Sequence, residues 1–251
     1  MKKKPLPRFF VPDLDASRTD ATLPPDEAEH LSRVLRLRAG DEIAVFDGRG
    51  HEFIARVSTA ARRQVTVALG ERVAPIEESP VQLTLAQAVL KGDKMDQVVR
   101  DAVMLGAARI VPLVTAHVAV SGEAIEAGRP AERWTRVALA SAKQSGRATL
   151  PPVDAPIPLT AFLRSCDADV KLLFVEPSIA GGAPSLRKFI DTPAPSRAAL
   201  LIGPEGGWSA DDVREARAAG FEAVTLGTMT LRADAVAVAA ISVMRVLWER
   251  E

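Results

Sequence analysis

The strongest indication of the fold is an apolar run that ends in a glycine-rich loop, ALLIGPEGGWS at residues 199–209. The run from Ala199 to Ile202 predicts a buried strand, and a helical pattern starts at Ser209. In parallel sheets such loops lie at the carboxyl ends of strands, where ligands bind, and glycines let backbone groups approach a ring such as adenine. Ser209 and Asp212 predict a capping box, whose negative charge disfavours a phosphate. The loop therefore favours a neutral or cationic ligand, and a plain strand-to-helix turn is the alternative.

A second glycine-bearing loop, LGTMTLRAD at residues 226–234, follows the next expected strand. Two such loops at strand ends can line one pocket from both sides. Neither G-x-G-x-x-G nor G-x-x-x-x-G-K-[ST] occurs, so dinucleotide and P-loop sites lose their main support. Arg232 precedes the last expected helix, where an arginine gains nothing from the helix dipole. It is either directed at an anionic group or a surface arginine.

The sequence around these loops alternates between strand and helix patterns, which is typical of a mostly parallel α/β sheet. Strands are expected at 81–90, 109–114, 170–175, 198–202 and 222–226, and helices at 93–105, 129–145, 183–190, 209–219 and 233–248. The proline-rich stretches 151–158 and 193–195 are expected to be loops.

The N-terminal part has a different pattern, with short apolar alternations that predict half-buried strands at 42–46, 52–57 and 64–69. DGRG at 47–50 predicts a hairpin turn, and helical spacing predicts one helix at 25–37. We therefore expect a small, mostly β, barrel-like domain that ends near residues 74–80.

Composition limits the function. The 251 residues include 32 Lys plus Arg and 32 Asp plus Glu, and this zero net charge excludes a uniformly basic nucleic-acid binder. A hydrophobic content of 47% indicates a globular protein. Cys166 is the single cysteine, and no Cys and His spacing fits zinc. The basic N-terminus lacks the apolar segment of an export signal, and the apolar stretch 235–244 is shorter than the roughly 20 residues that span a membrane. We expect a cytoplasmic protein without membrane or metal partners.

Two basic clusters in the N-terminal part are candidates for phosphate contacts. Lys2, Lys3, Lys4 and Arg8 form an arm without acidic residues, and Arg33, Arg36 and Arg38 follow one another closely. A solvated surface is the alternative for both clusters. Residues 1–75 hold 13 basic and 11 acidic side chains, whereas residues 151–251 hold 10 and 13. The basic excess therefore lies in the N-terminal domain.

Taken in order, the motifs of this chain resemble those of the RsmE-type methyltransferases of bacterial small-subunit ribosomal RNA, in the SPOUT superfamily. They are RFF at 8–10, His30 with RVLR at 33–36, FDG at 46–48, KGDKMD at 91–96, Leu105-Gly106, Arg133-Trp134, Gln144-Ser145 with Arg147, IGPEGG at 202–207 and Leu226-Gly227 with Leu231-Arg232. The resemblance covers nearly the whole chain.

The resemblance implies a PUA-like β-barrel at 1–75 and a SPOUT domain at 76–251, with a trefoil knot formed by about 170–235. It also implies a homodimer that uses S-adenosylmethionine to methylate N3 of a specific uridine in 16S rRNA of the small subunit. The implied cofactor-binding residues are Val175, Glu176, Leu201, Ile202, Gly203, Pro204, Glu205, Gly206, Gly207, Leu226, Gly227, Met229 and Leu231. The implied RNA contacts are Lys4, Arg8, Arg33, Arg36, Lys91 and Lys94.

The implied chemistry requires that uracil N3 lose its weakly acidic proton. We expect Arg232 to hydrogen-bond a uracil oxygen and stabilise the developing negative charge, with Arg8 as a second catalytic candidate. Met104, Ala233 and Asp234 depart from the family pattern, where a Glu, a Thr and a Glu are usual. Two alternatives therefore remain: an RNA-binding ribosome-assembly factor with weak or lost catalysis, and an α/β enzyme that uses a free nucleotide.

Overall fold

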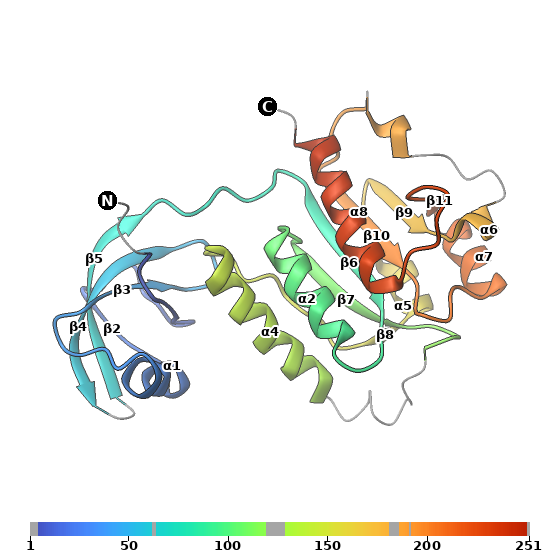
Figure 1. The fold of residues 1–251 in the computed structure, drawn as a ribbon. Helices are drawn as coiled ribbons and strands as arrows, with labels where there is room; N and C mark the ends of the chain where they lie inside the picture. The colour runs from blue at the N-terminus through green and yellow to red at the C-terminus, as the bar shows by residue number, and fades with distance from the viewer. Residues whose placement is uncertain (1–4, 62–63, 119–128, 181–185, 191, 250–251) are drawn as a thin grey trace. The chain divides into compact units, whose positions relative to one another are not determined.

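The computed structural model describes residues 5–61, 64–118, 129–180, 186–190 and 192–249. These residues divide into two compact units. Unit 1 comprises Met1–Glu77 and Ala142–Leu150, and unit 2 comprises Glu78–Ser141 and Pro151–Glu251. Figure 1 shows the helices and strands of both.

Unit 1 is a five-stranded mixed sheet in the order β1-β3-β4-β5-β2. Its elements are β1 (Arg8–Phe10), β2 (Asp20–Thr22), α1 (Pro25–Glu29), a π-helical turn (His30–Val34), β3 (Glu42–Phe46), β4 (Glu52–Ala61) and β5 (Gln64–Val73). Strand β1 runs parallel to β3, and the other pairs are antiparallel. Alternate residues such as Ile43, Val45, Val65 and Val67 are fully buried, because successive side chains of a strand point to opposite faces.

Two features of unit 1 differ from the sequence expectation. The single helix expected at 25–37 is a short α-helix followed by a π-helical turn that ends at Val34, and Arg36 has a φ of 55°. Leu35 cannot continue into a helix, because a left-handed residue follows it. The edge strands β1 and β2 were not expected, since three residues each are too few for a recognisable alternation.

Unit 2 is a six-stranded sheet in the order β11-β9-β10-β6-β7-β8, and all of its strand pairs are parallel. Its strands are β6 (Gln82–Ala88), β7 (Arg109–Val114), β8 (Ile157–Pro158), β9 (Val170–Phe174), β10 (Arg197–Ile202) and β11 (Glu222–Val224). Its helices are α2 (Lys94–Met104), α5 (Leu159–Ser165), α6 (Pro177–Ala180), a 3-10 turn (Leu186–Phe189), α7 (Ala210–Ala218) and α8 (Ala233–Trp248). Helix α4 (Arg129–Ser145) runs from the residues of unit 2 into those of unit 1.

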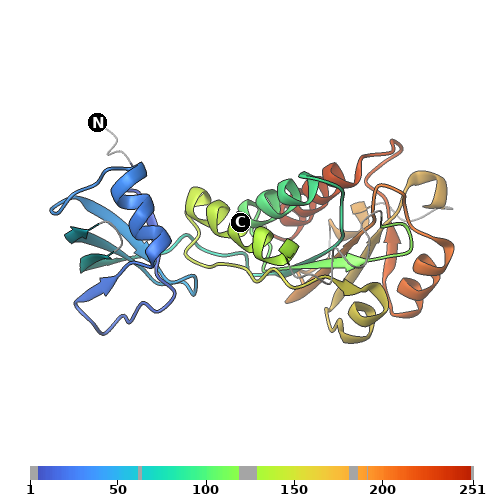
Figure 2. The same cartoon turned by 90° about the horizontal axis from the view of Figure 1, so that it is seen from below.

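Helices cover both faces of this sheet. In Figure 2, α2 (green) and α8 (red) lie on one side of it, and α5 (olive) and α7 (orange) lie on the other. On the α5 and α7 side, Phe162 and Phe221 pack with Val111, Leu113 and Leu201 in one apolar cluster. The six parallel strands therefore end together at one edge of the sheet, between the two helical layers.

The strand expected at 109–114 and the helices expected at 129–145 and 233–248 are confirmed to the residue. The helix expected at 183–190 lies partly outside the described residues, and its described part is a 3-10 turn. The stretch 151–158, expected to be a loop, ends in the short strand β8, which is a correction. Helix α5 was not expected, although Leu159, Phe162 and Leu163 have helical spacing. Among the described residues, no helix is long and apolar enough to cross a membrane.

Candidate functional site

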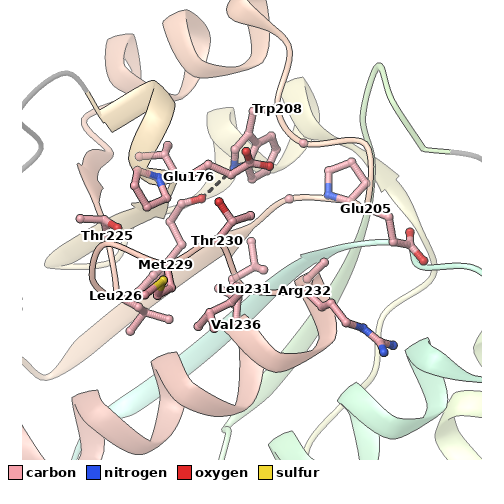
Figure 3. A pocket seen from close by; sticks show the side chains of 18 of the residues that line it. Glu176, Glu205, Trp208, Thr225, Leu226, Met229, Thr230, Leu231, Arg232 and Val236 are labelled. Carbon is pink, nitrogen blue, oxygen red and sulfur yellow. Dashed lines mark hydrogen bonds between the residues drawn. The ribbon is translucent and has the colours of Figure 1, made fainter.

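A cavity of about 400 Å³ lies at the carboxyl ends of β9, β10 and β11. Both glycine loops line it, as the sequence predicted, and the first turns of α8 and the side chain of Lys94 complete its wall. Figure 3 shows the side chains of most of the residues that line the cavity. The lining residues are Lys94, Phe174, Val175, Glu176, Pro177, Ile202, Gly203, Pro204, Glu205, Gly207, Trp208, Thr225, Leu226, Met229, Thr230, Leu231, Arg232, Ala233 and Val236.

Trp208 fixes the end of the first loop. Its indole Nε1 donates a buried hydrogen bond of 2.9 Å to the carbonyl oxygen of Phe174, at the end of β9 (Figure 3). The ring lies flat against Gly203, where an added Cβ would be 3.0 Å from Cε2 of the indole. A side chain at position 203 would therefore displace the indole from its hydrogen bond.

Glu205 connects the same loop to the segment after β6. Its Oε1 accepts hydrogen bonds from the backbone N–H of Lys91, at 3.2 Å, and from Nζ of Lys94, at 3.0 Å. Partial burial raises the pKa of Glu205, but these donors and its own backbone N–H outweigh burial and hold the pKa below the usual value. Glu205 is therefore an ionised, paired carboxylate on the cavity wall.

The two central glycines of the loop lie against its neighbours. A Cβ on Gly206 would be 3.1 Å from Cβ of His117 and 3.4 Å from its carbonyl oxygen, and Gly207 has a φ of +70°. Nδ1 of His117 lies 3.2 Å from the carbonyl oxygen of Gly207, which can only accept, so the imidazole is the donor. Position 206 therefore requires glycine because a side chain would have no space, and position 207 requires it because of the positive φ.

The capping box expected at the start of α7 is confirmed. The hydroxyl of Ser209 accepts from the backbone N–H of Asp212 at 3.0 Å, and the Asp212 carboxylate accepts from the backbone N–H of Ser209 at 3.1 Å. The free N–H groups that would bind a phosphate at this helix are therefore partly satisfied by the protein itself. This arrangement favours a ligand without phosphate, and the Glu176 carboxylate on the wall can accept a positively charged group.

Arg232 stands at the rim of the cavity as the residue before α8. Its side chain is 70% exposed, and its guanidinium donates two hydrogen bonds of 3.1 and 3.2 Å to the carboxylate of Asp234. The anionic group that Arg232 contacts in this structure is therefore Asp234, two residues further along the chain. An exposed pair of this kind contributes little to stability, so an anionic ligand can compete for the guanidinium.

Most of the expected cofactor-binding residues line the cavity: Val175, Glu176, Ile202, Gly203, Pro204, Glu205, Gly207, Leu226, Met229 and Leu231. Three others do not line it. Leu201 is buried in the apolar cluster on the α5 and α7 face, because alternation points it away from Ile202. Gly206 packs on His117, and Gly227 lines a second cavity of about 620 Å³.

Sequence reasoning missed several of the lining residues. Trp208 was inside the quoted loop but was not assigned to the site, and its aromatic ring next to two glycines was the available signal. Thr225, directly before the second loop, and Thr230, within it, also line the cavity and were not assigned. Val236 carried no signal of its own, since only the packing of α8 brings it to the cavity.

The side chain of Arg8 is largely buried and hydrogen-bonded within unit 1. Its side chain is 12% exposed, and it donates two hydrogen bonds to the carboxylate of Glu52 and three to the carbonyl oxygens of Ala142, Lys143 and Arg147, at the end of α4. The guanidinium also lies 4.5 Å from the centre of the Phe46 ring. All five N–H donors are thus used within the unit, so we withdraw Arg8 as a catalytic or RNA-binding candidate.

The other basic candidates are distributed differently. Arg33 is exposed and paired with Glu29, and Arg36 is exposed in its left-handed conformation next to it. Lys91 is exposed beside the cavity, and Lys94 lies on its wall. Lys4 lies outside the described residues. Among the described residues, no group of three or more His, Cys, Asp or Glu could hold a metal ion.

Comparison with protein families connects this site to a known class. Residues 77–245 match the model of an RNA methyltransferase domain, and residues 23–69 match that of an RNA methyltransferase PUA domain. The chain belongs to the RNA methyltransferase family. The sequence resemblance is thereby confirmed at the level of the family, with a PUA-like N-terminal domain and a methyltransferase domain.

Individual relatives agree with this membership. A protein of Synechocystis sp. named ribosomal RNA small subunit methyltransferase E is 33% identical over 96% of this chain and 78% of its own length. The crystal structure of a protein with the same name from Neisseria gonorrhoeae, bound to S-adenosylmethionine, has a TM-score of 0.87 and 32% identity, and the match covers 97% of this chain and 98% of that one. A putative methyltransferase from Legionella pneumophila, in complex with the same cofactor, has a TM-score of 0.88 and 30% identity, covering 96% and 97%.

Proposed function

We propose that this RNA methyltransferase transfers a methyl group from S-adenosylmethionine to N3 of a specific uridine in 16S rRNA. The observation that carries the proposal is the cavity between the two glycine loops, whose wall holds two carboxylates and two basic side chains and lacks a phosphate cradle. The names and bound cofactor of the relatives above support the same cofactor and the same RNA.

The residues of the cavity fit this cofactor. A volume of about 400 Å³ lies within the range of roughly 300–1,000 Å³ that small-molecule pockets have. Phe174, Ile202 and Leu226 offer apolar surface for an adenine ring, and the loop backbone offers partners for its edge. The carboxylate of Glu176 offers a counter-charge for a sulfonium or an ammonium group, whereas Glu205 is already paired with Lys94. When bound, the cofactor supplies the electrophilic methyl group.

The chain's own contribution to the reaction is to hold and polarise the base. The Arg232 guanidinium at the rim can exchange Asp234 for a uracil oxygen and stabilise negative charge as the N3 proton leaves. Lys94 adds positive charge on the same wall, although Glu205 neutralises part of it. Holding the base next to the methyl group contributes further through proximity.

The Arg232–Asp234 pair also favours a second candidate function, an RNA-binding assembly factor with weak or lost methyl transfer. The guanidinium is occupied in this state, and Asp234 and Ala233 stand where the resembled family has other residues. Such a factor would bind small-subunit rRNA without turnover. Calorimetry with S-adenosylmethionine separates the two candidates in part, because an absence of cofactor affinity favours the assembly factor.

Several finer features belong to the same proposal. We propose domains at 1–75 and 76–251, a trefoil knot formed by about 170–235, a homodimer and a cytoplasmic location. The exposed apolar side chains of Met104 and Val246, at 38% and 77% exposure, support burial against a second copy. The exposed Arg33, Arg36 and Lys91 remain our proposed RNA contacts, and Lys94 is proposed for both ligands.

The decisive experiment is methyl transfer to small ribosomal subunits from cells that lack the modification. Purified protein and radiolabelled S-adenosylmethionine should label 16S rRNA, and mass mapping should place the methyl group on N3 of one uridine. Large subunits serve as the control substrate. Failure to label any RNA, with normal cofactor binding, would reject the enzymatic proposal in favour of the assembly factor.

A further inference from the structure

Gln87 is a polar residue in an apolar row of the unit 2 sheet. It lies near the end of β6, and its side chain has 0% exposure. The strand register places it beside Ile202 of β10, which in turn lies beside Phe174 of β9. Paired residues of parallel strands point to the same face, so Gln87 continues the row of side chains that forms the floor of the cavity. It does not line the cavity itself.

The Gln87 side chain has a defined orientation. Its Nε2 donates hydrogen bonds of 2.9 Å to the carbonyl oxygen of Ala88 and 3.2 Å to that of Gly203. Both partners are acceptors only, so the amide cannot be flipped without losing both bonds. Its Oε1 is buried and has no hydrogen-bond partner among the described residues. An apolar residue of this size would avoid that unsatisfied group, so packing alone does not account for a glutamine here.

From this geometry we propose that Gln87 is a positioning residue for the cofactor, a role that rests on the proposed function. It sets the direction of the Gly203 carbonyl and therefore the start of the loop that lines the cavity. Three other contacts hold the rest of this loop: Glu205 with Lys94, Gly207 with His117, and Trp208 with Phe174. Gln87 is the hydrogen-bonding partner of Gly203 from the floor side, and it acts without touching the ligand.

The first test removes the donors and keeps the shape. The Gln87→Met variant has a side chain of similar length that cannot hold the Gly203 carbonyl. We expect its dissociation constants for S-adenosylmethionine and for the neutral product S-adenosylhomocysteine both to rise about tenfold, equivalent to about 1.4 kcal/mol. The KM for the cofactor should rise similarly, while kcat at saturation changes less than about threefold. Gln82→Met is the matched control, because Gln82 is exposed at the opposite end of the same strand.

The second test uses pH to separate positioning from a general loss of packing. In Gln87→Glu the buried carboxyl group faces two carbonyl oxygens, which it can approach only when protonated, so its pKa is raised. The protonated form donates one hydrogen bond and the ionised form donates none. We therefore expect affinity relative to wild type to recover several-fold between about pH 8.5 and about pH 6, for both ligands. Gln87→Met should show no such recovery.

The outcomes separate this inference from the function on which it rests. If wild-type protein binds the two ligands but Gln87→Met binds them equally well, the positioning role is wrong and the proposed cofactor remains. A loss in Gln87→Glu that does not change with pH overturns the role as well. An affinity for S-adenosylmethionine that falls over the same pH range, with no change for S-adenosylhomocysteine, also overturns it, because that pattern reports direct attraction between the ionised carboxylate and the sulfonium. If wild-type protein binds neither ligand, both proposals fall.

Discussion

The contact between Gly203 and Trp208 gives a prediction whose size follows from the structure. In Gly203→Ala the new Cβ would lie 3.0 Å from Cε2, 3.1 Å from Nε1 and 3.3 Å from Cδ2 of the indole. All three distances are shorter than an ordinary van der Waals contact, so the new methyl group would clash with the ring. The ring can retreat only by lengthening its 2.9 Å hydrogen bond to the carbonyl oxygen of Phe174.

Keeping the close contact and lengthening the hydrogen bond both cost free energy. Overpacking of a well-packed site costs about 1–3 kcal/mol, and a lost buried hydrogen bond costs about 1 kcal/mol or more. We therefore expect Gly203→Ala to lower the free energy of unfolding by about 2 kcal/mol. Urea titration followed by circular dichroism measures this loss directly, with the slope of the transition unchanged.

A double-mutant cycle identifies the cause. Trp208→Leu is destabilising by itself because it leaves space in the apolar cluster, but it removes the ring that the alanine would meet. In the Trp208→Leu background, Gly203→Ala should therefore cost less by about 1–2 kcal/mol. If the two changes are additive within about 0.5 kcal/mol, the steric explanation is refuted.

Three further predictions concern the charged side chains of Arg232, Arg8 and Asp47. Arg232→Ala should keep cofactor affinity within about twofold and lower kcat by about 10²–10³, measured by calorimetry and single-turnover methylation; an unchanged rate would contradict its role. Arg8→Met should destabilise unit 1 by about 3 kcal/mol in urea, because it leaves Glu52 buried and unpaired, whereas the exposed Arg56→Met should cost less than about 1 kcal/mol; equal losses would argue against this account. Burial raises the pKa of Asp47, but hydrogen bonds from His51 and Arg49 outweigh burial and hold the pKa below 3.8. The ionised carboxylate therefore stabilises the fold above pH 3.8. This contribution is lost as the pH falls through the lower pKa of the folded state. The stability difference between wild type and Asp47→Asn should therefore shrink below pH 3.8 in thermal unfolding at a series of pH values, and a constant difference would exclude the linkage.

The sequence predicted the parts of the site that are local in the chain. The strand before Gly203, the capping box at Ser209 and the loop after Leu226 each depend on residues within a few positions, and each was recognisable from pattern alone. Their meeting at one cavity also followed, because parallel strands end at the same edge of a sheet.

Other parts depend on register and tertiary partners, which the pattern does not contain. Gln87 and Gly203 are 116 positions apart, and their contact requires that β6 and β10 be neighbours with one particular pairing. Arg8 was interpreted as part of a free basic arm because Glu52 and the end of α4 are distant in sequence. Leu201 and Ile202 are equally apolar, and only the layers on each face decide which one meets the cavity.

The anchoring of the 203–208 loop has a consequence for the order of folding. Its partners come from β6, the turn after β7, and β9, through sequence separations of 116, 90 and 34 residues. Such non-local contacts form late, because each requires the closure of a long loop first. The cavity is thus complete only when four strands have assembled, and a partly folded chain presents no site for a ligand. A bound ligand should therefore slow unfolding and leave the rate of folding unchanged, so that it acts as a kinetic lock on the finished protein and not as a template for folding.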